Sequence, residues 1–254
     1  MGQCPGGGKK TAQDNYRGKV RERSFCRNMI KAVIFDMDGV IIDSEGEYLK
    51  YMYAFAREKR PDIRIEELYG TVGTTKKDCW DVMEKALKTG ETWEELREQY
   101  HSRGIWKRAF EEVDYRAIFR PEILPVMDQL REMGLKLAVA SSTNLEQVDH
   151  ILTLNHVKER LEIMVSGGMF KRSKPDPEIY LYTAEKLGAE PGECLVIEDS
   201  TVGITAASRA GMTVAALIDN RFAFDRSLAS CEICTLTEIP ALVRTLLGNK
   251  NTEK

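Results

Sequence analysis

The segment KAVIFDMDGVIIDS, residues 31–44, decides the fold expected for this chain. Its first half, from Ala32 to Phe35, is apolar and partly β-branched, which is typical of a strand buried on both faces. Two aspartates, Asp36 and Asp38, follow directly, and Gly39 allows a tight turn after them. A buried strand that ends on a pair of like charges requires a partner that offsets them.

Similar short runs rich in Val, Ile, Leu and Ala recur along the chain, and each predicts a further strand: 135–140, 161–165, 194–197 and 213–218. Helical patterns lie between them, over 122–133, 144–154, 176–188 and 200–210. Strands that alternate with helices indicate an α/β fold with a doubly wound, Rossmann-like parallel sheet.

The alternation is interrupted between the first two strands, where helical signals replace strand signals. Three pairs with capping-box spacing predict helix starts there: Ser44 with Glu47, Thr75 with Asp78, and Thr92 with Glu95. An apolar stripe follows the second pair, formed by Cys79, Val82, Met83, Ala86 and Leu87. We therefore expect a small helical cap domain, 44–119, inserted into a catalytic core of 29–43 and 120–254.

The composition is that of a soluble globular protein, with 43% hydrophobic and 30% charged residues in 254. A net charge of −3 gives no reason to expect nucleic acid or a membrane surface as partner, and no apolar run approaches the roughly 18 residues of a membrane span. Residues 1–28 are Gly-rich and basic, which predicts a disordered extension outside the fold. This extension lacks the apolar core of a secretory signal, so we expect a cytoplasmic protein, and a monomer.

Six cysteines in a chain of this length do not form a disulfide framework, and we expect reduced thiols. The spacing Cys231-Glu-Ile-Cys234 resembles half of a zinc site. No second such pair and no paired histidines accompany it, which favours ordinary thiols at a late strand.

Polar residues of one chemical kind follow the predicted strands. Asp36 and Asp38 come after the first strand, and Ser141, Ser142 and Thr143 after the second; Lys174 comes after the third, and Glu198 and Asp199 after the fourth. Ligands of doubly wound sheets bind beyond the carboxyl ends of the strands, so these side chains are expected to converge on one pocket.

Several carboxylates in one pocket repel each other unless a cation is present, and an oxygen-rich set of this kind suits Mg²⁺. One aspartate can then attack a phosphoryl group and form an aspartyl-phosphate, while a second exchanges protons with the leaving and attacking oxygens. A serine hydroxyl and a lysine ammonium would hold the phosphoryl oxygens.

At these residues the sequence resembles the haloacid dehalogenase-like phosphatases. DMDGV is similar to their first motif, Ser141 in VASST to the second, Lys174 in SKPDPEIY to the third, and VIEDSTVGI to the fourth, in matching order over residues 30 to about 218. The helical insertion after the first motif resembles the cap of the subgroup that contains β-phosphoglucomutase and many sugar-phosphate phosphatases.

The resemblance implies a role for each matching residue. Asp36 would be the nucleophile and a metal ligand, and Asp38 the general acid/base and a ligand through its backbone carbonyl. Ser141 and Lys174 would bind the phosphoryl group, with Ser142 as a backbone neighbour. Glu198 and Asp199 would complete the Mg²⁺ site, and the substrate would be a small phosphorylated metabolite such as a sugar phosphate.

Two points indicate which activity within the family this resemblance implies. Dehalogenases and phosphonatases of this fold lack the second aspartate, which is present here as Asp38. Family mutases carry a histidine in the helix that begins the cap, whereas this chain reads DSEGEYLKYMY, without a histidine. The sequence therefore favours a phosphatase, with a phosphosugar mutase as the alternative function. A non-catalytic binding protein on the same scaffold is a further alternative. The argument against it is that the chain retains every catalytic residue of the family motifs.

Substrate choice is expected to lie in the cap, in the segment YGTVGTTKKD, residues 69–78. The candidates are Thr74, Thr75, Lys76 and Lys77. The other interpretation of the lysines is that they are solvated residues in the first turn of a helix.

Overall fold

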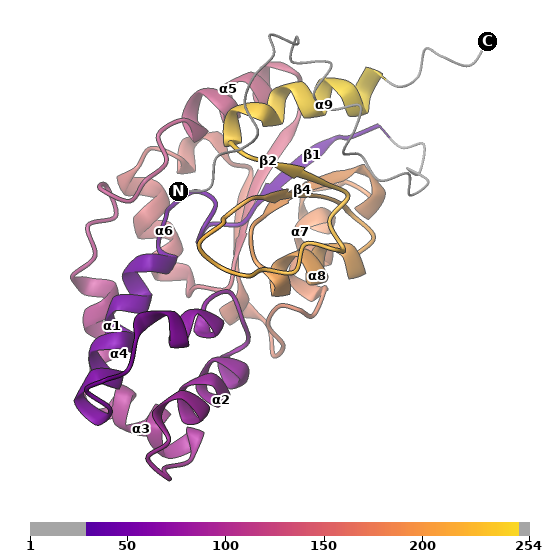
Figure 1. Cartoon of the computed structure of the whole chain (residues 1–254). Helices are drawn as coiled ribbons and strands as arrows, with labels where there is room; N and C mark the ends of the chain where they lie inside the picture. Colours follow the sequence, from indigo (N-terminus) through magenta and orange to yellow (C-terminus); the bar gives the residue numbers. More distant parts are fainter. Residues whose placement is uncertain (1–28, 249–254) are drawn as a thin grey trace, which may run out of the picture.

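The computed structural model describes residues 29–248, and the basic extension expected over 1–28 lies outside this range. The core is a six-stranded parallel sheet in the order β3-β2-β1-β4-β5-β6 (Figure 1). Its strands are β1 (Ala32–Phe35), β2 (Lys136–Ser141), β3 (Ile163–Ser166), β4 (Cys194–Glu198), β5 (Thr213–Leu217) and β6 (Cys231–Ile233). The expected α/β fold is confirmed, and the edge strand β6 carries Cys231.

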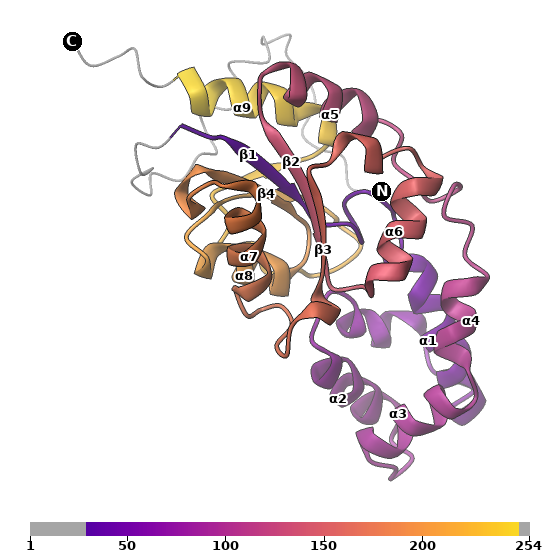
Figure 2. The same cartoon turned by 180° about the vertical axis from the view of Figure 1, so that it is seen from behind.

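Helices cover both faces of the sheet because successive strand residues point to opposite sides. The helices α5 (Ile123–Glu132), α6 (Leu145–Leu154) and α9 (Ile239–Gly248) pack on the face that receives Val33 and Phe35. The helices α7 (Glu178–Leu187) and α8 (Thr201–Arg209) pack on the face that receives Ala32 and Ile34 (Figure 2). β1 is thus buried on both sides, and the residues that follow it begin at the centre of the sheet.

A helical insert separates β1 from α5. It consists of α1 (Glu45–Lys59), a 3₁₀ segment (Ile65–Thr71), α2 (Lys76–Leu87), α3 (Trp93–Ser102) and α4 (Ile105–Glu111). These helices share a hydrophobic cluster of their own, which includes Phe55, Met83 and Leu96. Within residues 29–248, no helix is long and apolar enough to cross a membrane.

All three expected helix starts are present, and two of them have the expected side-chain cap. Thr75 accepts a hydrogen bond from the backbone of Asp78, and Thr92 forms a full capping box with Glu95. The helix α1 begins after Ser44 as expected, but the expected capping box is absent: the Ser44 hydroxyl makes no cap hydrogen bond and donates to Asp38, at 2.8 Å. Ser44 has helical backbone angles, φ −84° and ψ −19°, rather than the extended conformation of a capping residue, so its hydroxyl oxygen is not placed to accept from the first turn.

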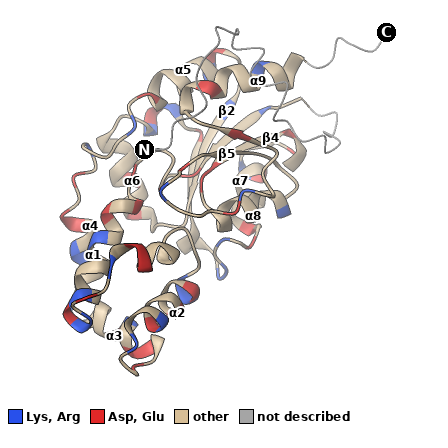
Figure 3. Cartoon of the chain, viewed as in Figure 1, with Lys and Arg blue, Asp and Glu red and all other residues tan. Residues whose placement is uncertain are grey.

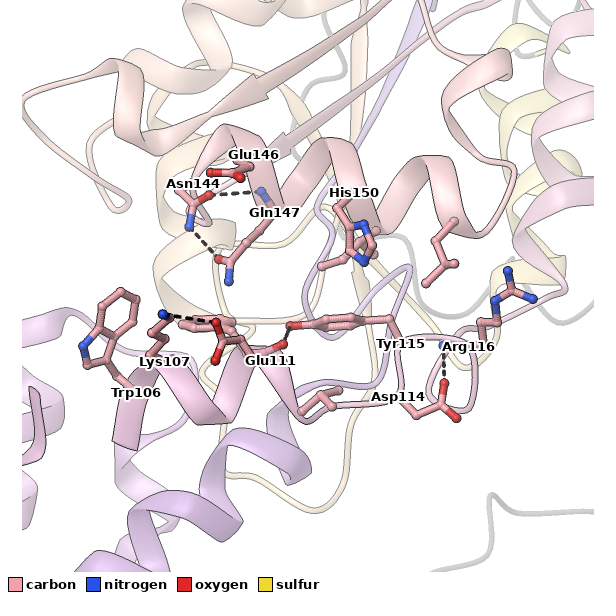
Figure 4. A pocket seen from close by; sticks show the side chains of 14 residues that line it. Trp106, Lys107, Glu111, Asp114, Tyr115, Arg116, Asn144, Glu146, Gln147 and His150 are labelled. Atoms are coloured by element: carbon pink, nitrogen blue, oxygen red, sulfur yellow. Dashed lines mark hydrogen bonds and ion pairs between the residues drawn. The ribbon is translucent and has the colours of Figure 1, made fainter. Parts of the chain in front are cut away.

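The insert meets the core along two edges. At one edge, a cleft of about 580 Å³ lies between α4 and α6, lined by Trp106, Phe110 and Tyr115 on one side and His150 on the other (Figure 4). At the other edge, Phe222 from the loop after β5 packs into the cluster of the insert. The insert therefore contacts the core closely on the β5 side and more openly on the α6 side.

Candidate active site

The polar residues that follow β1, β2 and β4 meet at the carboxyl edge of the sheet. A pocket of about 150 Å³ opens there. It is lined on the core side by Asp36, Asp38, Ser142, Lys174, Asp199, Ser200 and Val202, which we call the sheet wall. The insert contributes Glu45, Gly73 and Thr74, which we call the insert wall. The larger cleft between α4 and α6 contains none of the site residues expected from the sequence.

Lys174 is the centre of the sheet wall. Its ammonium donates to Asp36 Oδ1 at 2.6 Å, to Glu198 Oε1 at 2.7 Å and to the carbonyl oxygen of Ala140 at 3.0 Å. The side chain is buried, so these three acceptors replace the water that it loses. Burial alone would lower the pKa of Lys174, but the charges of Asp36 and Glu198 outweigh this effect and raise it. The lysine is therefore a fixed positive charge.

Glu198 is fully buried and fully hydrogen-bonded. One carboxylate oxygen accepts from Lys174 and from the Tyr180 hydroxyl, at 2.7 Å each. The other accepts from the backbone of Asp199 at 3.1 Å and from the Ser200 hydroxyl at 3.1 Å. Gly203 in α8 leaves room for this carboxylate, since a Cβ atom there would lie 1.7 Å from Glu198 Oε1.

Asp199 has the opposite environment. Both of its carboxylate oxygens are buried, and neither has a hydrogen-bond partner among the described residues. Gly39, with φ +79°, passes so close that a Cβ atom would lie 2.0 Å from Asp199 Oδ2. Burial, and then the charge of Glu198, hold the pKa of Asp199 well above its ordinary range. A buried carboxylate without a partner is expected to bind a cation.

Asp36, Glu198 and Asp199 together fit a metal site. Each offers a carboxylate oxygen, and these oxygens lie within 4.8 Å of one another. Burial raises the pKa of Asp36 to about 8, although Lys174 acts in the opposite direction. Three carboxyl groups face one ammonium, so a hard dication such as Mg²⁺ would balance the charge of the cluster.

Asp38 is oriented by hydroxyl groups rather than by the cluster. Ser44 donates to one of its carboxylate oxygens, and Thr143 donates to the other at 2.9 Å. Ser141 donates to that second oxygen at 3.3 Å and accepts a hydrogen bond from the backbone of Thr143. Ser141 is buried behind Asp38, whereas its neighbour Ser142 lines the pocket.

The insert wall has few fixed polar contacts. Glu45 is the first residue of α1, whose first turn is acidic (Figure 3). Burial, and then the charges of Asp38 and Asp36, raise the pKa of Glu45 to about 8. Thr74 lines the pocket, but Thr75 caps α2 and the exposed Lys76 lies outside the lining. Of the expected specificity residues, the structure therefore brings only Thr74 into this pocket.

Several residues at the site were missing from the sequence-based set. Ser44 was assigned to helix capping, and Tyr180 lies within SKPDPEIY without a pattern that predicts its contact with Glu198. Glu45 directly follows the segment KAVIFDMDGVIIDS, so its place at the start of the expected cap was the available signal.

Comparison with known proteins agrees with this geometry. The family model of haloacid dehalogenase-like hydrolases matches residues 33–217. A phosphorylated carbohydrates phosphatase of Thermotoga maritima is 31% identical over 184 residues, which cover 72% of this chain and 82% of that protein. Hexitol phosphatase B of Escherichia coli is 30% identical over 226 residues, which cover 86% and 97%.

Among solved structures, β-phosphoglucomutase of Clostridium difficile superposes with a TM-score of 0.69 over 89% of this chain and all of that one. Its sequence identity is 20%, so this likeness concerns the fold. The family model spans the sheet from β1 to β5 together with the insert, and both curated phosphatases cover most of the chain. The chain therefore belongs to the haloacid dehalogenase-like hydrolase family.

Proposed function

We propose that this hydrolase is a Mg²⁺-dependent phosphatase that cleaves a small sugar phosphate or polyol phosphate through an aspartyl-phosphate on Asp36. The observation that carries the proposal is the buried arrangement of Asp36, Lys174 and Glu198 beside the unpartnered carboxylate of Asp199. The family and the phosphatases among its relatives make the chain a phosphoric monoester hydrolase. The names of those relatives favour a phosphorylated carbohydrate as substrate.

Asp36 is the proposed nucleophile. Its carboxylate oxygen attacks phosphorus, and the bond from phosphorus to the ester oxygen breaks. Asp38, held by hydroxyl donors within reach of the pocket, gives a proton to the departing oxygen. Asp38 then takes a proton from water, whose oxygen attacks the aspartyl-phosphate and releases inorganic phosphate, so that Asp36 is regenerated.

The phosphoryl oxygens carry negative charge during both steps of the transfer, so positive groups must lie close to them. Lys174 supplies a buried ammonium that contacts Asp36 directly, which supports a role in binding the phosphoryl group. Ser142 lines the pocket, and Ser141 supports Asp38 from behind. Asp36, Glu198 and Asp199 would hold Mg²⁺, with the backbone carbonyl of Asp38 as a further ligand, and the ion would neutralise phosphoryl charge.

The insert is proposed to act as a cap over this site. Gly73 and Thr74 reach the pocket from the insert, and the pocket is small enough that a sugar phosphate requires the insert to move. Cys79, Cys194 and Cys231 are free thiols, which supports a reducing compartment such as the cytoplasm. We take the enzyme to act there as a monomer on a small metabolite.

The test is phosphate release from sugar and polyol phosphates, followed by ³¹P NMR with Mg²⁺ and after addition of EDTA. Release that stops with EDTA is the expected result. A mutase would instead convert β-glucose 1-phosphate to glucose 6-phosphate when primed with glucose 1,6-bisphosphate, without free phosphate. The helix α1 contains no histidine, which supports hydrolysis over this alternative. Absence of any phosphate release would overturn the proposal.

A further inference from the structure

Tyr180 is a buried residue of α7 whose two ends meet different surroundings. Its ring belongs to the hydrophobic cluster that includes Ile34 and Val196, on the face of the sheet covered by α7 and α8. Its hydroxyl group donates a hydrogen bond to Glu198 Oε1 at 2.7 Å. The side chain therefore connects the packed core directly to the carboxylates of the site.

The ring of Tyr180 also contacts the lysine of the sheet wall. Lys174 Nζ lies 4.9 Å from the ring centroid, close enough for the negative face of the ring to attract the ammonium. The same ammonium donates to Glu198 Oε1 at 2.7 Å, which is the oxygen that accepts from the Tyr180 hydroxyl. Tyr180, Lys174 and Glu198 thus form a closed set of contacts in which each side chain meets the other two.

The proposed reaction changes the surroundings of Lys174 but leaves this set of contacts in place. Before the reaction, the ammonium donates to Asp36 at 2.6 Å. A bond from Asp36 to phosphorus removes the charge of that carboxylate, so Lys174 loses an anionic partner. Glu198 and the face of the Tyr180 ring remain beside it. The ring attracts the ammonium without accepting its protons, which leaves them free to bond to phosphoryl oxygens.

From these contacts, and resting on the phosphatase function proposed above, we infer that Tyr180 is a positioning residue with two separable roles. Its ring holds the ammonium of Lys174 in place for the phosphoryl group. Its hydroxyl group fixes the carboxylate of Glu198, one of the residues that would hold Mg²⁺. Hydrogen bonds that orient a ligating side chain commonly change metal affinity by tenfold or more, so the second role is measurable by itself.

Two variants separate the ring from the hydroxyl group. Tyr180→Phe keeps the ring, so it should lower the affinity for Mg²⁺ by about tenfold and leave kcat near the wild-type value at saturating Mg²⁺. Tyr180→Leu removes the ring as well, so kcat at saturating Mg²⁺ should fall by about tenfold more, the size of a buried cation–π contact. Calorimetric titration of the metal-free protein with Mg²⁺ measures the affinity, and p-nitrophenyl phosphate hydrolysis measures kcat. Tyr180→Met replaces the ring if the leucine variant folds poorly.

Tyr182 provides the matched control in the same helix. Its ring centroid also lies 4.9 Å from a lysine ammonium, that of Lys186, but neither residue lines the pocket. Tyr182→Phe and Tyr182→Leu should leave both the Mg²⁺ affinity and kcat unchanged.

The two roles of Tyr180 can be rejected separately. Wild-type Mg²⁺ affinity in Tyr180→Phe would overturn the role of the hydroxyl group. Equal kcat in Tyr180→Phe and in the variant without the ring, at saturating Mg²⁺, would overturn the role of the ring. A wild-type protein that releases no phosphate from any ester would instead reject the phosphatase function, while the Mg²⁺ titration would still test the hydroxyl group.

Discussion

The sheet wall and the insert wall of the pocket are built in different ways. Lys174 in the sheet wall and Glu198 behind it have every polar side-chain atom satisfied by hydrogen-bond partners. Glu45 and Thr74 on the insert wall have no side-chain hydrogen bond to any described residue. The first arrangement fixes geometry before the substrate arrives, and the second leaves donors and acceptors for the substrate to use.

This difference separates chemistry from selection. In the proposed mechanism, the sheet wall carries the groups that react with or neutralise a phosphoryl group, whatever alcohol is attached to it. The insert wall is proposed to meet the part of the substrate that varies. Changes in the sheet wall should therefore affect all substrates alike, and changes in the insert wall should affect substrates differently.

The largest expected effect is that of Asp36→Asn. An amide cannot act as the nucleophile, so kcat should fall at least about 10³-fold for every substrate. The melting temperature should be kept or raised, because burial disfavours the charged form of Asp36. Phosphate release and thermal unfolding measure the two effects. Thr74→Ala, on the insert wall, is the comparison and should change kcat less than about tenfold; near-wild-type turnover by Asp36→Asn would exclude Asp36 as nucleophile.

Gly39→Ala tests whether the unpartnered carboxylate of Asp199 holds the metal. The new Cβ atom would displace that carboxylate, so the Mg²⁺ concentration needed for half-maximal activity should rise by about tenfold or more. Gly134→Ala is a matched control, because Gly134 has φ +80° and no atom within 4 Å of an added Cβ. Both variants share a backbone cost of about 1 kcal/mol, and equal Mg²⁺ dependence in the two would contradict the assignment.

The sheet wall was the predictable part of the site. Asp36, Lys174, Glu198 and Asp199 follow strands of a parallel sheet, and the topology of such a sheet places strand ends together. The alternation of strands and helices was sufficient to predict this from local patterns. The expected strand at 161–165 begins later, at Ile163, because Leu161 still ends a 3₁₀ turn.

The insert wall and its contacts were less predictable, because they depend on tertiary contacts. Ser44 has the same spacing to a glutamate as Thr92, yet its backbone is helical rather than extended, and its hydroxyl contacts Asp38 instead of the helix end. Trp80 lay outside the expected apolar stripe of α2 but is buried between Phe55 and Tyr100. Its neighbours come from α1 and α3, which the pattern of α2 alone does not contain.

Phe222→Ala tests how the insert is held over the site. Phe222 comes from the core and packs in the hydrophobic cluster of the insert. The centroid of its ring lies 5.5 Å from that of Tyr69, in an edge-to-face arrangement. Its loss should cost about 3 kcal/mol of stability and loosen the insert, raising KM for sugar phosphates several-fold. Hydrogen exchange should increase in α1–α4 and not in β1 or β4. Phe222→Leu should recover most of the stability; uniform exchange changes would contradict this division.

Binding of Mg²⁺ should stabilise the protein more at high pH than at low pH. The pKa of Asp36 is raised from 3.8 to about 8, so the stability associated with its protonated form is lost as the pH rises through about 8. A dication favours the ionised carboxylates and offsets that loss. We expect a gain of a few degrees in melting temperature at pH 8.5 and a smaller one at pH 5.5. Asp199→Asn should remove most of the gain, whereas equal gains at both pH values would contradict a carboxylate site.

The smallest expected effect joins the two walls. Ser44 stands at the junction of β1 and α1, and its hydroxyl is one of three that orient Asp38. Ser44→Ala should lower kcat only a few-fold, because Thr143 and Ser141 still hold the other carboxylate oxygen. Ser44→Thr keeps the hydroxyl and should restore the rate. If Ser44→Ala lowers kcat as much as Asp38→Ala does, the orientation of the acid/base residue depends on the start of the insert, and the division between the two walls is less complete than their contacts indicate.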